Sequence, residues 1–156
     1  MTVDQKVLEY LEVLKGIGID AVVCEHPETK QIAEVLSYLN LDFADCVPTL
    51  ILKGDGKYLA IVIRGDTKAD FKKIKSALSV TDLRFATPQE FEEFTRLPIG
   101  AACVYTPGAI TLIDPKVFEK EYLMGGSGRF NCSIKYKTAD LTKIPDSQVV
   151  DITKTD

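Results

Sequence analysis

The stretch TLILKGDGKYLAIVIRG, residues 49–65, decides the fold class of this chain. Two β-rich runs flank a short turn that contains Asp55 and Gly56, and this arrangement is typical of a β-hairpin. The apolar residues of both runs are nearly continuous, which indicates strands covered on both faces. The sequence therefore predicts two adjacent antiparallel strands in the centre of a sheet.

Helical and strand patterns alternate irregularly on either side of this hairpin. Gly16 and Asn40 are the expected ends of the first two helices. Thr87 and Glu90 form a capping box, with Pro88 at the first helical position. We expect helices near residues 4–15, 29–39, 67–78 and from 88, and helical turns after Asp114 and at 138–144. We expect further strands at 21–26, 109–113, 121–124, 132–136 and 148–152. This order favours a mixed α/β fold, with helices packed around one mixed, mostly antiparallel sheet.

The composition is that of a soluble globular protein. The chain has 156 residues, of which 46% are hydrophobic and 27% charged, with no repeat or linker-like tract. We therefore expect a single compact domain over residues 1–156. No apolar run approaches the roughly 18 residues that span a bilayer, and the N-terminal segment is acidic and helical in pattern, unlike a signal peptide. We expect a cytoplasmic protein without membrane contact.

Cysteine and histidine usage argues against a metal site. His26 is the only histidine, and no C-x-x-C pair occurs among the cysteines, which are Cys24, Cys46, Cys103 and Cys132. We therefore expect no metal and no cofactor, with the thiols acting as small buried apolar groups. Any Ser–His or Cys–His nucleophile would depend wholly on His26.

The formal net charge of −4 gives no global attraction to nucleic acid, so any polynucleotide contact has to be local. Lys68, Lys72 and Lys75 have the spacing that gathers charges on the exposed face of the helix expected at 67–78. This face is either a phosphate-binding patch or an ordinary solvated surface.

Three segments in order resemble a known family. They are the hairpin followed by TKADFKKIKSAL (67–78), RFATPQEFEEFTRLPIGAACVYTPGAI (84–110) and YLMGGSGRFNCSIKYKTADL (122–141). Over roughly residues 20–152 the chain resembles the YbaK/prolyl-tRNA-synthetase-associated domain. The resemblance implies a compact mixed α/β domain with one pocket at the ends of the central strands. It also implies hydrolysis of the ester of a mischarged tRNA, and an aminoacyl-tRNA synthetase as a further partner.

Two motifs depart from the family pattern. The family opens the hairpin strand with Lys-Thr-Leu, and here the aligned triplet is Pro48-Thr49-Leu50. Proline fits the entry of a strand, but it carries no ammonium to hold a phosphate or polarise a carbonyl. Lys53 is a poor substitute, because it lies on the opposite face of the strand from Pro48. The family loop Gly-x-x-x-Pro corresponds to residues 100–104, which have no proline at that spacing.

The resemblance also implies a set of substrate-binding residues. The backbone around Gly126 and Gly128 is expected to face an oxyanion or phosphate, or else to form an ordinary turn. Asn131 and Ser133 are expected to share a strand face towards the substrate, and His26 either lines the pocket or is a packed histidine. The expected substrate-binding set is His26, Pro48, Thr49, Gly100, Gly126, Gly128, Asn131 and Ser133. The expected tRNA phosphate contacts are Lys68, Lys72 and Lys75.

Two functions stay open at this point. The leading hypothesis is a metal-independent aminoacyl-tRNA deacylase, whose chemistry rests on positioning, oxyanion stabilisation and the tRNA's own ribose hydroxyl. The alternative is a catalytically impaired module of the same fold that binds tRNA, a synthetase or a small aminoacyl-like ligand. Pro48 in place of the family lysine favours the alternative, and the pocket glycines favour the enzyme.

Overall fold

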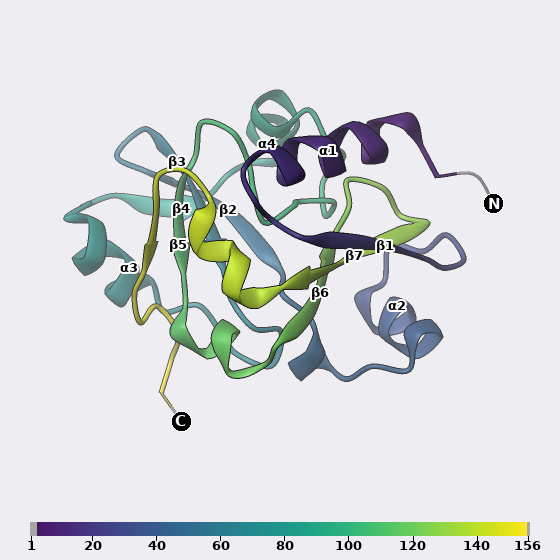
Figure 1. Cartoon of the computed structure of the whole chain (residues 1–156). Helices are drawn as coiled ribbons and strands as arrows, with labels where there is room; N and C mark the ends of the chain where they lie inside the picture. Colours follow the sequence, from purple (N-terminus) through teal and green to yellow (C-terminus); the bar gives the residue numbers. More distant parts are fainter. Residues whose placement is uncertain (1–2, 156) are drawn as a thin grey trace.

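The computed structural model describes residues 3–155, and within this range the strands form two sheets (Figure 1). The smaller sheet is antiparallel, in the order β1 (Ala21–Glu25), β7 (Cys132–Lys137), β6 (Tyr122–Gly126). The larger sheet has the order β4 (Leu83–Phe85), β2 (Thr49–Gly54), β3 (Lys57–Val62), β5 (Ile110–Ile113), β8 (Ser147–Val149). Its β4–β2 and β2–β3 pairs are antiparallel and its β3–β5 and β5–β8 pairs parallel. The mixed α/β fold class is confirmed.

The predicted hairpin is present as β2 and β3, with Leu52 opposite Leu59. Asp55 and Gly56 have φ of 49° and 82°, the type I′ geometry that matches the twist of the flanking strands. Leu52 and Leu59 belong to the buried cluster that includes α3 (Phe71–Leu78), and Ile51 belongs to the one that includes α4 (Pro88–Thr95). The hairpin is therefore covered on both faces, as its continuous apolar pattern predicts.

The strands divide between two sheets, where the sequence predicted one, because β7 pairs with β1 on one side and with β6 on the other. β6 meets the chain that leads into β2 at a single bridge, where the Val47 N–H donates to the Met124 carbonyl at 2.8 Å. Gly125 permits this crossing, since a Cβ there would lie 2.9 Å from the Tyr136 ring and 3.2 Å from Val47. The crossing places the entry of β2 directly beside the smaller sheet.

The first two helices lie close to their predicted ranges. α1 (Gln5–Gly16) is capped at its start by Asp4. Gly16 is still helical, and the left-handed residue that closes the helix is Gly18, with φ of 88°. α2 (Ile32–Leu39) begins after the predicted residue 29 and ends at Asn40, whose φ of 56° confirms the predicted stop.

The third helix begins later than predicted, and this removes Lys68 from it. Asp70 caps α3, because its carboxylate accepts hydrogen bonds from the N–H groups of Lys72 and Lys73 at 3.0 and 3.3 Å. Lys68 lies before this cap, where its carbonyl accepts from the Lys154 N–H at 2.8 Å. The three-lysine helical face is therefore corrected to one that carries Lys72 and Lys75 only.

The remaining elements follow the sequence pattern except β4 and η1 (Phe43–Asp45), which it did not predict. The capping box of α4 is confirmed, with the Thr87 hydroxyl accepting from the Glu90 N–H at 3.2 Å. Short 3₁₀ helices form at η1 (Phe43–Asp45), η2 (Pro115–Glu119) and η3 (Thr138–Lys143). β8 ends at Val149, earlier than predicted, because the Ile152 N–H is taken by the buried Asp114 carboxylate at 3.0 Å. Within residues 3–155, none of the helices has the length and apolar character needed to cross a bilayer.

Candidate functional site

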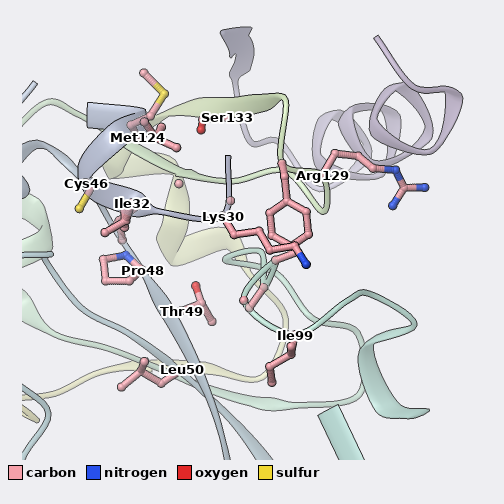
Figure 2. Close-up of a pocket in the computed structure, with 18 of the residues that line it drawn as sticks. Lys30, Ile32, Cys46, Pro48, Thr49, Leu50, Ile99, Met124, Arg129 and Ser133 are labelled. Atoms are coloured by element: carbon pink, nitrogen blue, oxygen red, sulfur yellow. The ribbon is translucent and has the colours of Figure 1, made fainter. Parts of the chain in front are cut away.

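A cavity of about 350 Å³ lies beside the crossing of β6 and the chain that enters β2 (Figure 2). Its walls come from residues 46–51, from α2, from the loop 99–102, and around the β6–β7 turn from residues 124–126, 129–130 and 132–133. Most of the lining side chains are apolar, and no aspartate or glutamate lines it among the described residues. Such a cavity favours an uncharged group inside, held by a few polar contacts.

The β2 wall of the cavity holds Pro48 and Thr49, as predicted. The Thr49 Oγ1 atom is buried and has no hydrogen-bond partner within residues 3–155. Figure 2 shows this hydroxyl pointing into the cavity. A buried hydroxyl without a partner costs about 1–3 kcal/mol, so this wall is prepared to receive a polar group. Lys53 does not reach the cavity, because its ammonium pairs with Glu90 at 3.0 Å.

The opposite wall carries the pair His26 and Ser133, which are 4% and 8% exposed. The His26 Nδ1 atom lies 2.9 Å from the Pro27 carbonyl oxygen, and its Nε2 atom lies 3.0 Å from the Ser133 Oγ. Because a carbonyl only accepts, Nδ1 carries the ring proton and Nε2 accepts from the Ser133 hydroxyl. The sequence left His26 open between a pocket residue and a packed histidine, and the structure makes it both.

Backbone packing and backbone conformation explain why two of the cavity-lining positions are glycine. Gly126 lines the cavity, and a Cβ at this position would collide with the Ala102 carbonyl oxygen. The loop 99–102 therefore packs directly on the β6 backbone, which requires glycine. Gly100 also lines the cavity and has a φ of 90°, a conformation that favours glycine.

Gly128 and Asn131 lie apart from the other predicted residues. Gly128 lines a second cavity of about 240 Å³, next to α1 and the end of α4. Asn131 lines neither cavity, because it precedes β7 and its carbonyl accepts from the His26 N–H at 3.1 Å. The expectation that Asn131 shares a substrate-facing strand surface with Ser133 is corrected accordingly. The structure brings together His26, Pro48, Thr49, Gly100, Gly126 and Ser133.

Two cationic residues that were not in the expected substrate-binding set, Lys30 and Arg129, also line the cavity. Lys30 lies 5.4 Å from the centre of the Phe130 ring, and Arg129 pairs with Asp4 through Nε at 3.2 Å. The pKa of Asp4 lies below its ordinary value because it accepts the Lys6 backbone N–H and pairs with Arg129. Arg129 directly follows the glycine-rich turn, a signal the sequence did offer. Lys30 carries no comparable signal.

The predicted phosphate-binding lysines are remote from this cavity. Lys68, Lys72 and Lys75 do not line it. Figure 1 shows α3 and α2 at opposite ends of the molecule, and α2 belongs to the cavity wall. A tRNA contact of these lysines stays a prediction, and it requires the nucleic acid to extend across the larger sheet.

The cavity offers no metal cluster in the part of the chain that the structure describes. Within residues 3–155, no group of three or more His, Cys, Asp or Glu side chains is arranged to hold a metal ion. Burial raises the pKa of the Cys46 thiol, which lines the cavity, to about 11. This thiol is therefore protonated at neutral pH and donates to the Phe43 carbonyl at 3.2 Å.

A comparison with known proteins matches the part of the chain that contains the cavity-lining residues. The model of the family described as the aminoacyl-tRNA editing domain matches residues 26–144. The chain is 40% identical over 75 residues to a proline–tRNA ligase of Geobacillus thermodenitrificans, and 39% identical over 75 residues to that of Geobacillus kaustophilus. These alignments cover 48% of this chain and only 13% of each ligase.

Two solved structures share the fold over almost the whole chain. A protein described as a candidate trans-editing enzyme for prolyl tRNA synthetase has a TM-score of 0.86 at 18% identity, with 99% of this chain and 100% of that chain covered. A hypothetical protein has a TM-score of 0.85 at 24% identity, with 96% and 100% covered. At these identities the likeness shows a common fold.

Proposed function

The chain belongs to the aminoacyl-tRNA editing domain family, and from this premise we propose that it is an aminoacyl-tRNA deacylase that hydrolyses the ester of a mischarged tRNA. The observation that carries the proposal is the cavity at the entry of β2. It combines apolar walls, two cations (Lys30 and Arg129) and a Thr49 hydroxyl that has no hydrogen-bond partner in the part of the chain that the structure describes. The aligned relatives are proline–tRNA ligases, so tRNAs for proline are the first substrates to test.

The lining suggests how an aminoacyl-tRNA end is held. Lys30 and Arg129 supply positive charge for the phosphates of the terminal nucleotides. The apolar interior, which includes Ile51, Phe91 and Met124, receives the amino acid side chain. Because none of the described residues that line the cavity is a carboxylate, a cationic side chain such as that of lysine finds no partner among them and is disfavoured.

The catalytic groups differ from those that the family resemblance implies. Pro48 occupies the position of the hallmark lysine, so no ammonium meets the ester from the β2 wall. Thr49 remains as a hydroxyl donor for the oxyanion that develops when the carbonyl is attacked. Hydrolysis then rests on orientation within the cavity and on hydrogen-bond donors in place before the reaction.

Mischarged tRNA is the proposed partner, and a prolyl-tRNA synthetase is the proposed source of that substrate. A synthetase separates small side chains by only about 1–3 kcal/mol per methylene, so a second site that hydrolyses wrong products is useful. This role places the protein in the cytoplasm together with the translation apparatus.

The direct test measures ester hydrolysis by the full chain on a panel of tRNAs. The panel pairs tRNA for proline with small apolar, hydroxyl-bearing, cationic and cognate amino acids. We expect hydrolysis above the spontaneous rate for at least one small uncharged non-cognate amino acid, and none above it for the lysyl ester. Binding of aminoacyl-tRNA without hydrolysis of any ester would contradict the proposal and identify a binding module instead.

A further inference from the structure

A second cavity, of about 240 Å³, adjoins the first at the β6–β7 turn. Gly126 lines the first cavity, Gly128 lines the second, and Arg129 lines both. We infer that the second cavity binds the nucleotide that precedes the terminal adenosine of the tRNA, with its phosphate held by Lys6, Arg96 and Arg129. This inference rests on the proposed function, because the first cavity then holds the aminoacyl ester.

The positive charge of the second cavity comes from three separate segments of the chain. Lys6 belongs to α1, Arg96 follows the last residue of α4, and Arg129 belongs to the β6–β7 turn. None of the described residues that line this cavity is an aspartate or a glutamate. Cations gathered without a lining carboxylate attract an anion, and phosphate is the anion that each linked nucleotide carries.

Lys6 and Arg96 are available to a ligand. The Lys6 ammonium lies 3.9 Å from the Glu9 carboxylate, with the two side chains 74% and 57% exposed. Exposed pairs of this kind contribute only about 0–1 kcal/mol, so Lys6 can turn to a phosphate at little cost. Arg96 forms no ion pair within residues 3–155.

Arg129 is held between the two cavities by contacts with α1 and with its own turn. Its Nε atom lies 3.2 Å from the Asp4 carboxylate, and its Nη1 group donates to the Gly128 carbonyl at 2.9 Å. Asp4 also caps α1, because its carboxylate accepts from the Lys6 N–H at 2.7 Å. Figure 2 shows the Arg129 side chain extending from the first cavity towards the purple helix α1. Because Asp4 offsets the charge of Arg129, the excess positive charge of the second cavity comes from Lys6 and Arg96.

Hydroxyl groups in the second cavity already bond to the backbone. The Tyr10 hydroxyl donates to the Tyr105 carbonyl at 3.0 Å and accepts from the Tyr105 N–H at 3.1 Å. The Thr95 hydroxyl donates to a carbonyl within α4 at 2.7 Å. These hydroxyls hold the walls in place, and the cations together with the non-polar surfaces of Leu97 and Pro107 are left to contact a ligand. Sites for single-stranded nucleic acid combine the same two elements, charge for the phosphate and non-polar surface for the base.

The size of the first cavity leaves the preceding nucleotides outside it. At about 350 Å³ it lies near the lower end of the range for sites that hold one small ligand. It therefore suits the aminoacyl group and its terminal nucleoside. The RNA continues from that nucleoside through a phosphate, and Arg129 lines both cavities. The second cavity can thus receive the next phosphate and nucleotide without a break in the positive charge.

The test compares two substrates of the full chain that differ only in the nucleotides beyond the first cavity. One is the aminoacyl ester of adenosine, and the other is the same ester on the trinucleotide CCA, with the amino acid that the protein removes fastest from tRNA. We expect the wild-type kcat/KM to be about 10-fold higher or more for the trinucleotide ester, because only that substrate carries phosphates. Rising salt concentration should reduce this advantage and leave hydrolysis of the adenosine ester unchanged.

Two variants remove the available cations, Lys6→Gln and Arg96→Gln. Each should lower kcat/KM for the trinucleotide ester by about 3- to 10-fold and leave the adenosine ester within about twofold of wild type. Hydrolysis of the adenosine ester also shows that each variant is folded. The matched control is Lys15→Gln, which removes one exposed cation from α1 but lines neither cavity. It should keep the wild-type rates on both substrates.

Three outcomes would overturn the inference. They are a wild-type protein that hydrolyses both esters equally well, variants that keep the wild-type ratio of the two rates, and an equal loss on both esters in Lys6→Gln and Arg96→Gln. All three leave the proposed deacylase function standing, because wild-type hydrolysis is measured in the same experiment. Absence of wild-type hydrolysis of both esters and of aminoacyl-tRNA would contradict that function itself.

Discussion

The two walls of the cavity differ in how their polar groups are satisfied. On the β2 wall, Thr49 presents a buried hydroxyl without a partner among the described residues, and Pro48 presents no polar side chain. On the β1–β7 wall, His26 and Ser133 are buried and complete a hydrogen-bonded chain that ends on the Pro27 carbonyl. An open hydroxyl is suited to receive the substrate, and an oriented pair is suited to move a proton. The difference therefore separates a wall that can bind a polar group of the substrate from a wall whose polar groups bind each other.

The largest effect should come from substitution of His26, which accepts the hydrogen bond from the Ser133 hydroxyl. We expect His26→Gln to lower kcat by about 10-fold or more with little change in KM, because the imidazole that orients the Ser133 hydroxyl is lost while the apolar binding surface is kept. Single-turnover and steady-state hydrolysis measure both constants. If His26→Gln raises KM and leaves kcat unchanged, His26 belongs to the binding groups, and the contrast between the two walls is wrong.

The second prediction concerns a cation placed on the β2 wall by the substitution of Pro48. Pro48→Lys should raise hydrolysis by roughly 30- to 1,000-fold, because an oriented ammonium adds about 2–4 kcal/mol of transition-state stabilisation. The strand should tolerate the change, since lysine can adopt the φ of proline and the Pro48 carbonyl can still accept from the Ile63 N–H. Pro48→Met is the matched control, long and uncharged. A rate that is unchanged or lower in Pro48→Lys alone would show that the β1–β7 wall works without any help from β2.

The third prediction compares the two buried hydroxyls that lack a partner in residues 3–155, Thr49 and Thr111. Replacing either threonine by valine should raise the free energy of unfolding by about 1 kcal/mol, because an unsatisfied polar atom leaves the interior. Only Thr49→Val should lower kcat/KM, by roughly 2- to 10-fold, the value of one neutral hydrogen bond to the substrate. Denaturant unfolding and hydrolysis kinetics together test this, and an equal kinetic loss in Thr111→Val would contradict it.

The smallest effects concern the charges outside the reacting centre. Removing one cation that contacts tRNA should reduce the slope of log affinity against log salt concentration by somewhat under one unit. We expect this for Lys30→Gln and Arg129→Gln at the cavity, and for the triple variant Lys68→Ala, Lys72→Ala, Lys75→Ala near α3. Filter binding over a salt series measures the slopes. An unchanged slope in the triple variant would exclude the α3 contact and confine the tRNA to the cavity side.

The sequence by itself determined the features that depend on neighbouring residues. The Asp55-Gly56 turn, the capping box at Thr87 and the left-handed stop at Asn40 are confirmed. Each follows from steric limits and hydrogen bonds within a few residues, so the local sequence is sufficient. The position of Thr49 in the cavity wall also followed from the strand pattern together with the family resemblance.

Only the tertiary structure decided which of these features meet. The division of the strands into two sheets depends on the pairing of β7 with β1, and that pairing brings Ser133 to His26. Gly126 is required by a carbonyl from the loop that follows α4, which no local pattern shows. Contacts of this kind join residues far apart in the sequence, and their energies depend on how the whole core packs. The residues of the site could therefore be named from the sequence, but the hydrogen bond between His26 and Ser133 could not.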